Sequence, residues 1–215
     1  MIKNIITTIF LMLAISLPAF SADVIPNYSK TLHTRTYGFY QVGKLITLHE
    51  QPDEKSKIIQ TISWTKEKLM PESLCYDDVF SIYVESKELA LMAVEDENED
   101  WVKLIYDNKN NKSGWFKKDD PYKFMTWINF YNAYGKKYGL KILKDTPKDF
   151  VVLRGQPEDN SQIIARINQP EFIKLNVIRG NWALVSVVDI DKTPKTGYVR
   201  WRSDDGIKYL FPDIK

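Results

Sequence analysis

Most of the chain consists of short segments in which every second residue is hydrophobic, separated by polar turns. Residues 89–94 (LALMAV) and 173–178 (IKLNVI) show this pattern, which is typical of strands with one buried face. Tryptophans open two further runs of this kind, Trp101 and Trp182, and each run leads into a polar turn and a second strand. The pattern predicts a mainly β protein built from short antiparallel strands.

The pattern occurs twice. Residues 48–62 (LHEQPDEKSKIIQTI) and 153–167 (LRGQPEDNSQIIARI) are identical at seven of fifteen positions. A second similarity joins residues 100–120 to 181–205, in which Gly114-Trp115 matches Gly197-Tyr198. The repeated unit has 65 to 75 residues, too few for a single open sheet to bury both faces, so we expect each copy to close into a small barrel.

The copies differ between their second and third strands. Five residues separate Ile167 from Ile173, whereas twenty-six separate Ile62 from Leu89. The first copy therefore holds an insertion over residues 63–87. Within it, residues 79–84 (VFSIYV) are β-branched and aromatic, which predicts a hairpin with residues 89–94.

A helix is predicted between the copies, over residues 121–139. Asp120 and Pro121 fit an N-cap and first helical position, and Gly139 fits the residue just past the end. Aromatic residues recur at helical spacing on one face: Phe124, Trp127, Tyr131, Tyr134 and Tyr138. This stripe is either the face that packs between the copies, which we favour, or a platform for a ligand.

The ordered motifs resemble the bacterial SH3-like (SH3b) domain. The second copy shows a Leu before a Pro-containing loop, an Ile pair, a Trp-led strand and a closing Gly-aromatic-Val, at Leu153, Pro157, Ile163-Ile164, Trp182 and residues 197–199. The first copy matches at Leu48, Pro52, Ile58-Ile59, Trp101 and residues 114–116, but carries the insertion. The resemblance implies two SH3-like barrels of five or six strands, residues 22–120 and 140–215. It also implies an exported protein, because domains of this family usually accompany cell-wall enzymes or serve as targeting and interaction modules.

The N-terminus adds an expectation about location. Lys3, an apolar run over residues 5–17 and the small-residue pattern ending at Ser21 follow the order of a secretory signal peptide, residues 1–21. Thirteen apolar residues are short for a spanning helix, so we expect no membrane span once the signal is removed.

Charge and cysteine content exclude two further possibilities. The formal net charge is +2 and the sequence has no long run of charges of one sign, so we expect no electrostatic attraction to nucleic acid. One cysteine excludes an internal disulfide.

Catalytic and metal chemistry have weak candidates. Cys75 is a possible nucleophile with His33 or His49 as its base, but no third group to orient the imidazole is evident, so we expect no catalytic site. Two histidines and one cysteine lack zinc spacing, and the acidic run over residues 95–100 (EDENED) lacks the glycine of a calcium loop and is interpreted as a solvated hairpin tip. We expect no metal and no cofactor.

The aromatic residues of the predicted strands remain as ligand-binding candidates, because peptide-binding barrels of this kind use aromatic-walled grooves. They are Trp101, Trp115, Trp182, Tyr198 and Trp201. We regard Trp201, between Arg200 and Arg202, as the most interesting, and barrel closure as the main alternative role for Trp101 and Trp182. The sequence thus favours an exported, non-catalytic module that binds cell-wall peptide or an envelope protein. The alternatives are a cysteine-dependent cell-wall hydrolase and an adaptor subunit whose insertion docks a partner enzyme.

Overall fold

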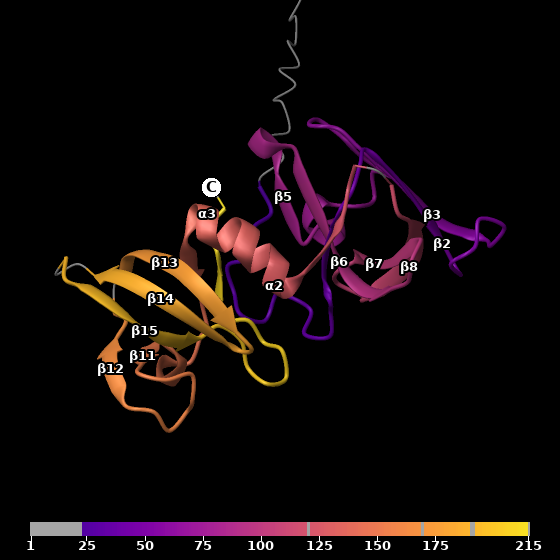
Figure 1. Cartoon of the computed structure of the whole chain (residues 1–215). Coiled ribbons are helices and arrows are strands. Elements are labelled where there is room, and N and C mark those ends of the chain that lie inside the picture. Colours follow the sequence, from indigo (N-terminus) through magenta and orange to yellow (C-terminus); the bar gives the residue numbers. More distant parts are fainter. Residues whose placement is uncertain (1–22, 120, 169, 190–191, 215) are drawn as a thin grey trace, which may run out of the picture.

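The computed structural model describes residues 23–119, 121–168, 170–189 and 192–214, and these fold mainly into two antiparallel sheets (Figure 1). The expected signal peptide, residues 1–21, lies outside the described residues. No helix in the described ranges has the length and apolar character needed to cross a bilayer.

The first sheet has the strand order β4-β3-β2-β8-β7-β6-β1-β9, and β5 pairs with β6 outside this path. Its strands are β1 (Gly38–Gln41), β2 (Leu45–His49), β3 (Ile58–Trp64), β4 (Leu69–Met70), β5 (Ile82–Val84), β6 (Leu89–Glu97), β7 (Trp101–Asp107), β8 (Lys112–Lys117) and β9 (Phe124–Thr126). A short helix α1 (Tyr76–Val79) and a 3-10 turn (Glu85–Lys87) flank β5.

The second sheet has the order β12-β11-β15-β14-β13-β10-β16. Its strands are β10 (Leu140–Ile142), β11 (Val152–Arg154), β12 (Ile163–Arg166), β13 (Pro170–Arg179), β14 (Trp182–Asp189), β15 (Pro194–Arg200) and β16 (Leu210–Pro212). A 3-10 turn (Lys148–Phe150) precedes β11. Seven strands of the first sheet, from β3 to β9, follow the same order as these seven, so the repeat in the sequence is a repeat of topology.

The repeated segment forms the same hairpin twice. β2 pairs with β3 and β11 with β12, and each pairing shifts register at the equivalent step, after Leu48 and after Leu153. In both turns a serine hydroxyl accepts a hydrogen bond from the glutamine amide five residues earlier, at 2.9 Å from Ser56 to Gln51 and 2.8 Å in the second copy. The kept Ser and Pro positions therefore fix one turn geometry in both copies.

One alignment from the sequence is out of register. Residues 89–94 were expected to match 173–178 position by position, with Leu89 on Ile173. The ladders instead pair Val94 with Leu104 and Leu175 with Val185, so Val94 and Leu175 are equivalent, three residues away from that alignment. Strands rich in apolar residues resemble one another at several offsets, and only pairing with a neighbouring strand selects one.

The insertion belongs to the first sheet, as predicted. β5 pairs with β6 through Ile82–Leu91, Tyr83–Ala90 and Val84–Leu89, which confirms the expected hairpin. The apolar side chains of β5 and Val79 of α1 are fully buried, as is Phe80 between them, whereas Met70 on β4 is 39% exposed. Most of the insertion's apolar surface is therefore used inside the protein.

The connecting helix begins later than predicted. It runs over residues 127–138 as α2 (Trp127–Phe130), a π-helical segment (Tyr131–Gly135) and α3 (Lys136–Tyr138). Thr126 is its N-cap, accepting a hydrogen bond from the Asn129 amide at 3.3 Å. Pro121 does not start the helix, because the following residues extend the first sheet as β9, which pairs with β1.

The aromatic face of this helix is core, as favoured above. Trp127, Phe130 and Tyr131 are buried, and Tyr134 and Tyr138 are partly buried against the same cluster, whereas Phe124 lies on β9. Figure 1 shows the helix between the two sheets, and one apolar cluster includes residues of the helix and of both sheets. A second cluster fills the inner face of the first sheet. The helix therefore joins the sheets through a shared core.

The described strands form open ladders. β4 and β9 stand at the ends of the first sheet and β12 and β16 at the ends of the second, and no described ladder joins either pair of ends. The fold is thus established as two antiparallel sheets, and the expected closed barrels are not seen as continuous strand pairing.

Candidate ligand-binding faces

A row of side chains crosses the outer face of the first sheet. Strand pairing places Ile58 opposite His49, His49 opposite Trp115, and Trp115 opposite Lys103, on β3, β2, β8 and β7. Directly paired residues in an antiparallel sheet project to the same face, so these four side chains lie side by side. We call them the first transverse row.

The second sheet repeats this row. Ile163, Arg154, Tyr198 and Leu184 are paired in the same way across β12, β11, β15 and β14. Buried neighbours such as Val185 and Val199 point to the other face, where the core lies. This second transverse row has the same order of an aliphatic residue, a cationic or imidazole group and an aromatic ring.

The two isoleucines were treated in the sequence as strand-building positions, but Ile58 is 55% exposed and Ile163 is 45% exposed. An apolar side chain that is about half exposed gains less from folding than a buried one, so core packing accounts for only part of the recurrence of these isoleucines. The sequence did hold a signal for the exposure of these isoleucines. They recur in both copies of the repeat, on strands next to those whose alternation turns Trp115 and Tyr198 outward.

A tryptophan and an ion pair border each row. Trp101 is paired with Lys117, whose ammonium group binds the Glu54 carboxylate in the repeated turn. Trp182 is paired with Arg200, which binds Asp159 in the matching turn and also Asp204. The arrangement of tryptophan, cation and acidic turn is therefore the same in both sheets.

These ion pairs shift the pKa values of their members. The hydrogen bond from Lys117 lowers the pKa of Glu54, and the same bond raises the pKa of Lys117. Burial opposes the charge of Arg200, but its hydrogen bonds to Asp159 and Asp204 outweigh burial and raise its pKa. Both cations therefore stay charged beside their tryptophans, and the Arg200 guanidinium lies 5.6 Å from the centre of the Trp182 ring.

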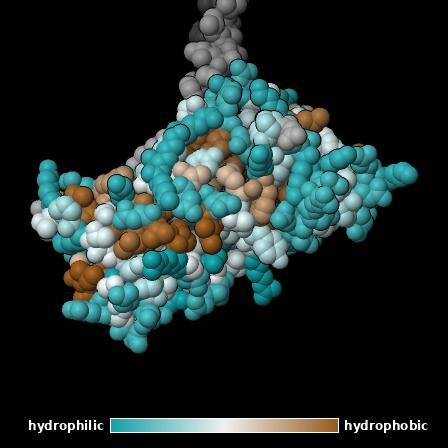
Figure 2. All heavy atoms as spheres, in the orientation of Figure 1, coloured by the Kyte–Doolittle hydropathy of each residue, from teal (hydrophilic) through white to brown (hydrophobic). Residues whose placement is uncertain are grey.

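Four of the five predicted aromatics thus gather on these faces. Trp115, Trp182 and Tyr198 are half-buried, and Trp101 is largely covered, with the His49 ring against it at 5.4 Å. In the second sheet Figure 2 shows apolar surface over β12 and over the β13–β14 hairpin, where Ile163 and Phe172 are exposed. The second face is the more apolar of the two, because Leu184 replaces Lys103.

Trp201, the candidate we regarded as most interesting, does not belong to either face. Its side chain is fully buried, its indole nitrogen donates to the Gly180 carbonyl at 2.9 Å, and its ring lies 4.4 Å from that of Tyr131. The reason is strand alternation: Trp201 is two residues from inward-facing Val199 and shares its face. Trp201 anchors the helix to the second sheet and cannot contact a ligand at the surface.

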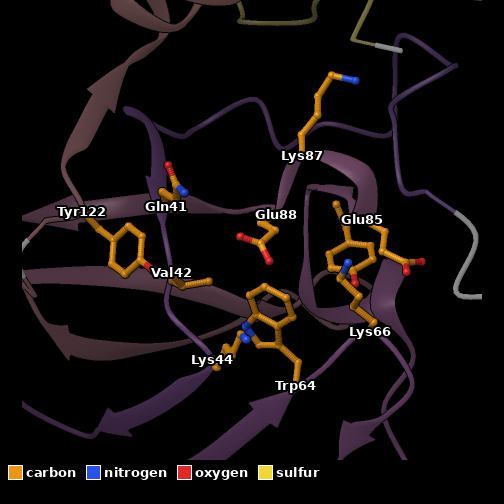
Figure 3. Close-up of a pocket in the computed structure, with 10 residues that line it drawn as sticks. Gln41, Val42, Lys44, Trp64, Lys66, Glu85, Lys87, Glu88 and Tyr122 are labelled. Carbon is orange, nitrogen blue, oxygen red and sulfur yellow. The ribbon is translucent and has the colours of Figure 1, made fainter.

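A separate pocket lies in the first sheet, where the insertion supplies part of the lining. It has a volume of about 260 Å³, and Figure 3 shows it bordered by the indole of Trp64, by Val42 and Tyr122, and by charged side chains. No sequence motif indicated this pocket, because it forms between β1, β3 and the turn that follows β5.

The residues around Cys75 do not supply the parts of a thiol nucleophile. Cys75 is exposed, and its nearest potential ligand groups are the carboxylates of Asp77 and Asp78. His33 contacts the Asn108 side chain at 3.2 Å, and the Nδ1 of His49 contacts the Ser56 carbonyl at 3.1 Å. Within the described residues neither imidazole is hydrogen-bonded to Cys75.

The acidic run forms a hairpin tip, in agreement with the sequence. Asn98 accepts hydrogen bonds from the amides of Asp100 and Trp101 in the turn between β6 and β7. Lys118 binds the Glu97 carboxylate at 2.9 Å and the carbonyl of Glu99 at 3.2 Å. The ammonium group of Lys118 therefore offsets part of the negative charge of this hairpin tip.

Comparison with known proteins adds no relative. The chain matches none of the models of known protein families, and a search of curated proteins finds none similar to it.

Proposed function

We propose that the protein is an exported, non-catalytic binding module with two SH3-like units, which recognises cell-wall peptide or an envelope protein through its two transverse rows. The shared seven-strand order of the sheets and the SH3-like motifs support the assignment of the units as small barrels. The proposal extends to the bordering tryptophans, Trp101 and Trp182.

The observation that carries the proposal is the recurrence of one outward row in both sheets. Ile58 and Ile163 hold equivalent positions at the start of the rows, and Trp115 and Tyr198 hold equivalent positions within them. Core packing explains why inward residues recur, but it does not explain an exposed isoleucine beside a half-exposed ring. A common ligand requirement does.

The chemistry of the rows selects a class of ligand. Exposed aliphatic and aromatic groups suit the side chains of an extended peptide, which loses little entropy on docking. Groups that can donate to a carboxylate lie in both rows, namely His49 and Lys103 in the first and Arg154 in the second. Lys103 also binds the Glu95 carboxylate at 2.9 Å, and Arg154 donates through Nη1 to the Ser161 carbonyl at 2.7 Å. The ligand expected is an extended peptide with small apolar side chains and free carboxyl groups, as in a cell-wall peptide.

Cleavage of the expected signal after Ser21 would leave the contacts of the first described residues in place. The Asp23 carboxylate accepts a hydrogen bond from the Glu85 amide at 3.0 Å, and Val24 exchanges backbone hydrogen bonds with Tyr83 at 2.8 Å. A chain cut after Ser21 would keep both of these contacts.

Sedimentation with purified peptidoglycan tests the proposal. The mature chain should sediment with the polymer, and a variant with Ile58→Ser and Ile163→Ser should remain in solution. Substitution of exposed residues changes stability little, within about 0.5 kcal/mol, so loss of binding would report on the faces. Ile128→Ser, on the connecting helix and 42% exposed, is the matched control. Equal sedimentation of both variants would contradict the proposal.

A further inference from the structure

The pocket beside the insertion has a rigid aromatic wall. The indole nitrogen of Trp64 donates to the Gly43 carbonyl at 2.7 Å, and the rings of Phe80 and Tyr83 meet its ring edge-on at 5.7 and 5.6 Å. The opposite wall is Tyr122, whose ring lies so close to Gly43 that a Cβ there would be 3.3 Å from it. These contacts hold the pocket in shape without a ligand.

Glu88 is held at this pocket by a strained turn. Its backbone is left-handed, with φ 48° and ψ 38°, and its amide donates to the Glu85 carbonyl at 3.0 Å, closing the turn between β5 and β6. This conformation is uncommon for a residue other than Gly, Asn or Asp. Figure 3 shows the Glu88 side chain next to the Trp64 indole.

Positive groups reach the same pocket. Figure 3 shows Lys44 and Lys66 on either side of the Trp64 indole, with Glu88 above the indole in this view and Tyr122 to the left. Within the described residues no hydrogen bond or ion pair joins the side chain of Glu88 to Lys44 or Lys66. The pocket is therefore lined by two carboxylates, Glu85 and Glu88, and by three ammonium groups, Lys44, Lys66 and Lys87, around the Trp64 indole.

We propose that this pocket binds a short zwitterionic peptide, of about dipeptide size, through both of its charged ends. The ligand's ammonium group binds the Glu88 carboxylate beside the Trp64 indole, and the attraction is that of opposite charges joined by a hydrogen bond. Its carboxylate faces Lys44 and Lys66. Its small side chains contact Val42 and Tyr122, and a volume of about 260 Å³ accommodates them.

This site is independent of the transverse rows. Part of its lining comes from the insertion, which the second copy lacks, and it involves none of the residues of the two rows. Either proposal can fail while the other stands.

Titration of the ¹⁵N-labelled protein with L-alanyl-L-alanine, followed by heteronuclear NMR, tests the inference. Saturable shifts are expected at the Trp64 indole and Glu88 amide signals. N-acetyl-alanyl-alanine lacks the ammonium group and alanyl-alanine amide lacks the carboxylate, so each should bind at least about tenfold more weakly, which corresponds to loss of one charged hydrogen bond.

Variants separate recognition from folding. Glu88→Gln should weaken alanyl-alanine binding about tenfold but leave binding of the N-acetyl form unchanged, because only the free ammonium group uses the carboxylate. Glu67→Gln is the matched control, as an exposed glutamate outside the pocket wall. Absence of saturable shifts at Trp64, or equal affinity for the free and both capped dipeptides, would overturn the inference.

Discussion

A single buried lysine lies where the N-terminal segment, the connecting helix and the C-terminal loop meet. Lys208 is 1% exposed, its ammonium nitrogen donates to the His33 carbonyl at 3.0 Å, and it lies 4.0 Å from the centre of the Trp127 ring. Burial, with a smaller contribution from the nearby Arg202 charge, lowers the pKa of Lys208 to about 7. The ring and the carbonyl favour the charged form and limit this effect.

This pKa predicts a pH dependence of stability. Between about pH 7 and 10.5 the folded state holds Lys208 neutral while the unfolded chain binds its proton, so unfolding takes up a proton. The free energy of unfolding should therefore rise with pH in this window, by about 2–3 kcal/mol between pH 7.5 and 9.5. Urea unfolding at several pH values measures it. Lys208→Met should remove the rise, and an equally steep rise in that variant would assign it to another group.

At the scale of elements, the connecting helix contains a glycine, a residue of low helix propensity for which alanine would be the better helix former. Gly135 is buried, and a Cβ on it would lie 2.9 Å from Leu175 and 3.0 Å from Leu140. Gly135→Ala should lower the free energy of unfolding by about 1–3 kcal/mol through overpacking, although helix propensity predicts a gain of about 1 kcal/mol. Thermal and urea unfolding decide between the two signs. Lys136→Ala, exposed on the same helix, is the control and should change little.

The repeated Gly-aromatic motif makes a paired prediction. A Cβ on Gly114 would lie 2.8 Å from Ile59 and 3.0 Å from Leu48, and a Cβ on Gly197 would lie 3.0 Å from the Arg154 carbonyl. Alanine at either position should destabilise the protein by about 1–3 kcal/mol. Gly155→Ala, where the nearest atom is 3.6 Å away, should be tolerated. If Gly155→Ala destabilises as much as the other two, close packing is not the cause.

The repeat shows how far sequence reasoning reaches. Alternation and turn residues were enough to predict the β7–β8 and β14–β15 strand–turn–strand units and the pairing of β5 with β6, because these are local. The helix start was wrong because β9 gains its hydrogen bonds from β1, some 85 residues away in the chain. Trp201 was misplaced because its burial depends on Tyr131, and the Trp64 pocket could not be predicted because four separate segments form it.

At the scale of the molecule, the two sheets share one core. The apolar cluster that contains Phe39 and Leu91 of the first sheet also contains Leu175 and Phe211 of the second, with Trp127 of the helix between them. The N-terminal segment adds a second link, since Val24 pairs with Tyr83 in the first sheet and Tyr28 forms a bridge with Lys144 near the second. We infer that the two sheets stabilise each other.

A single cooperative unfolding transition should follow. Far-UV circular dichroism and tryptophan fluorescence should give coincident urea curves, and residues 140–215 expressed alone should not fold, because they lack the helix that covers their core. Two separated transitions, or a folded isolated fragment, would show that the shared core contributes little to either sheet.

The central claim is that both transverse rows bind the same kind of peptide. Affinity of the mature chain for purified peptidoglycan, measured with Trp115→Ala, with Tyr198→Ala and with both, tests it most directly. If both rows engage one polymer, each single substitution should weaken binding by at least about tenfold and the double variant should abolish it, since linked sites add avidity. Unchanged binding by the double variant, with its fold intact, would contradict the claim.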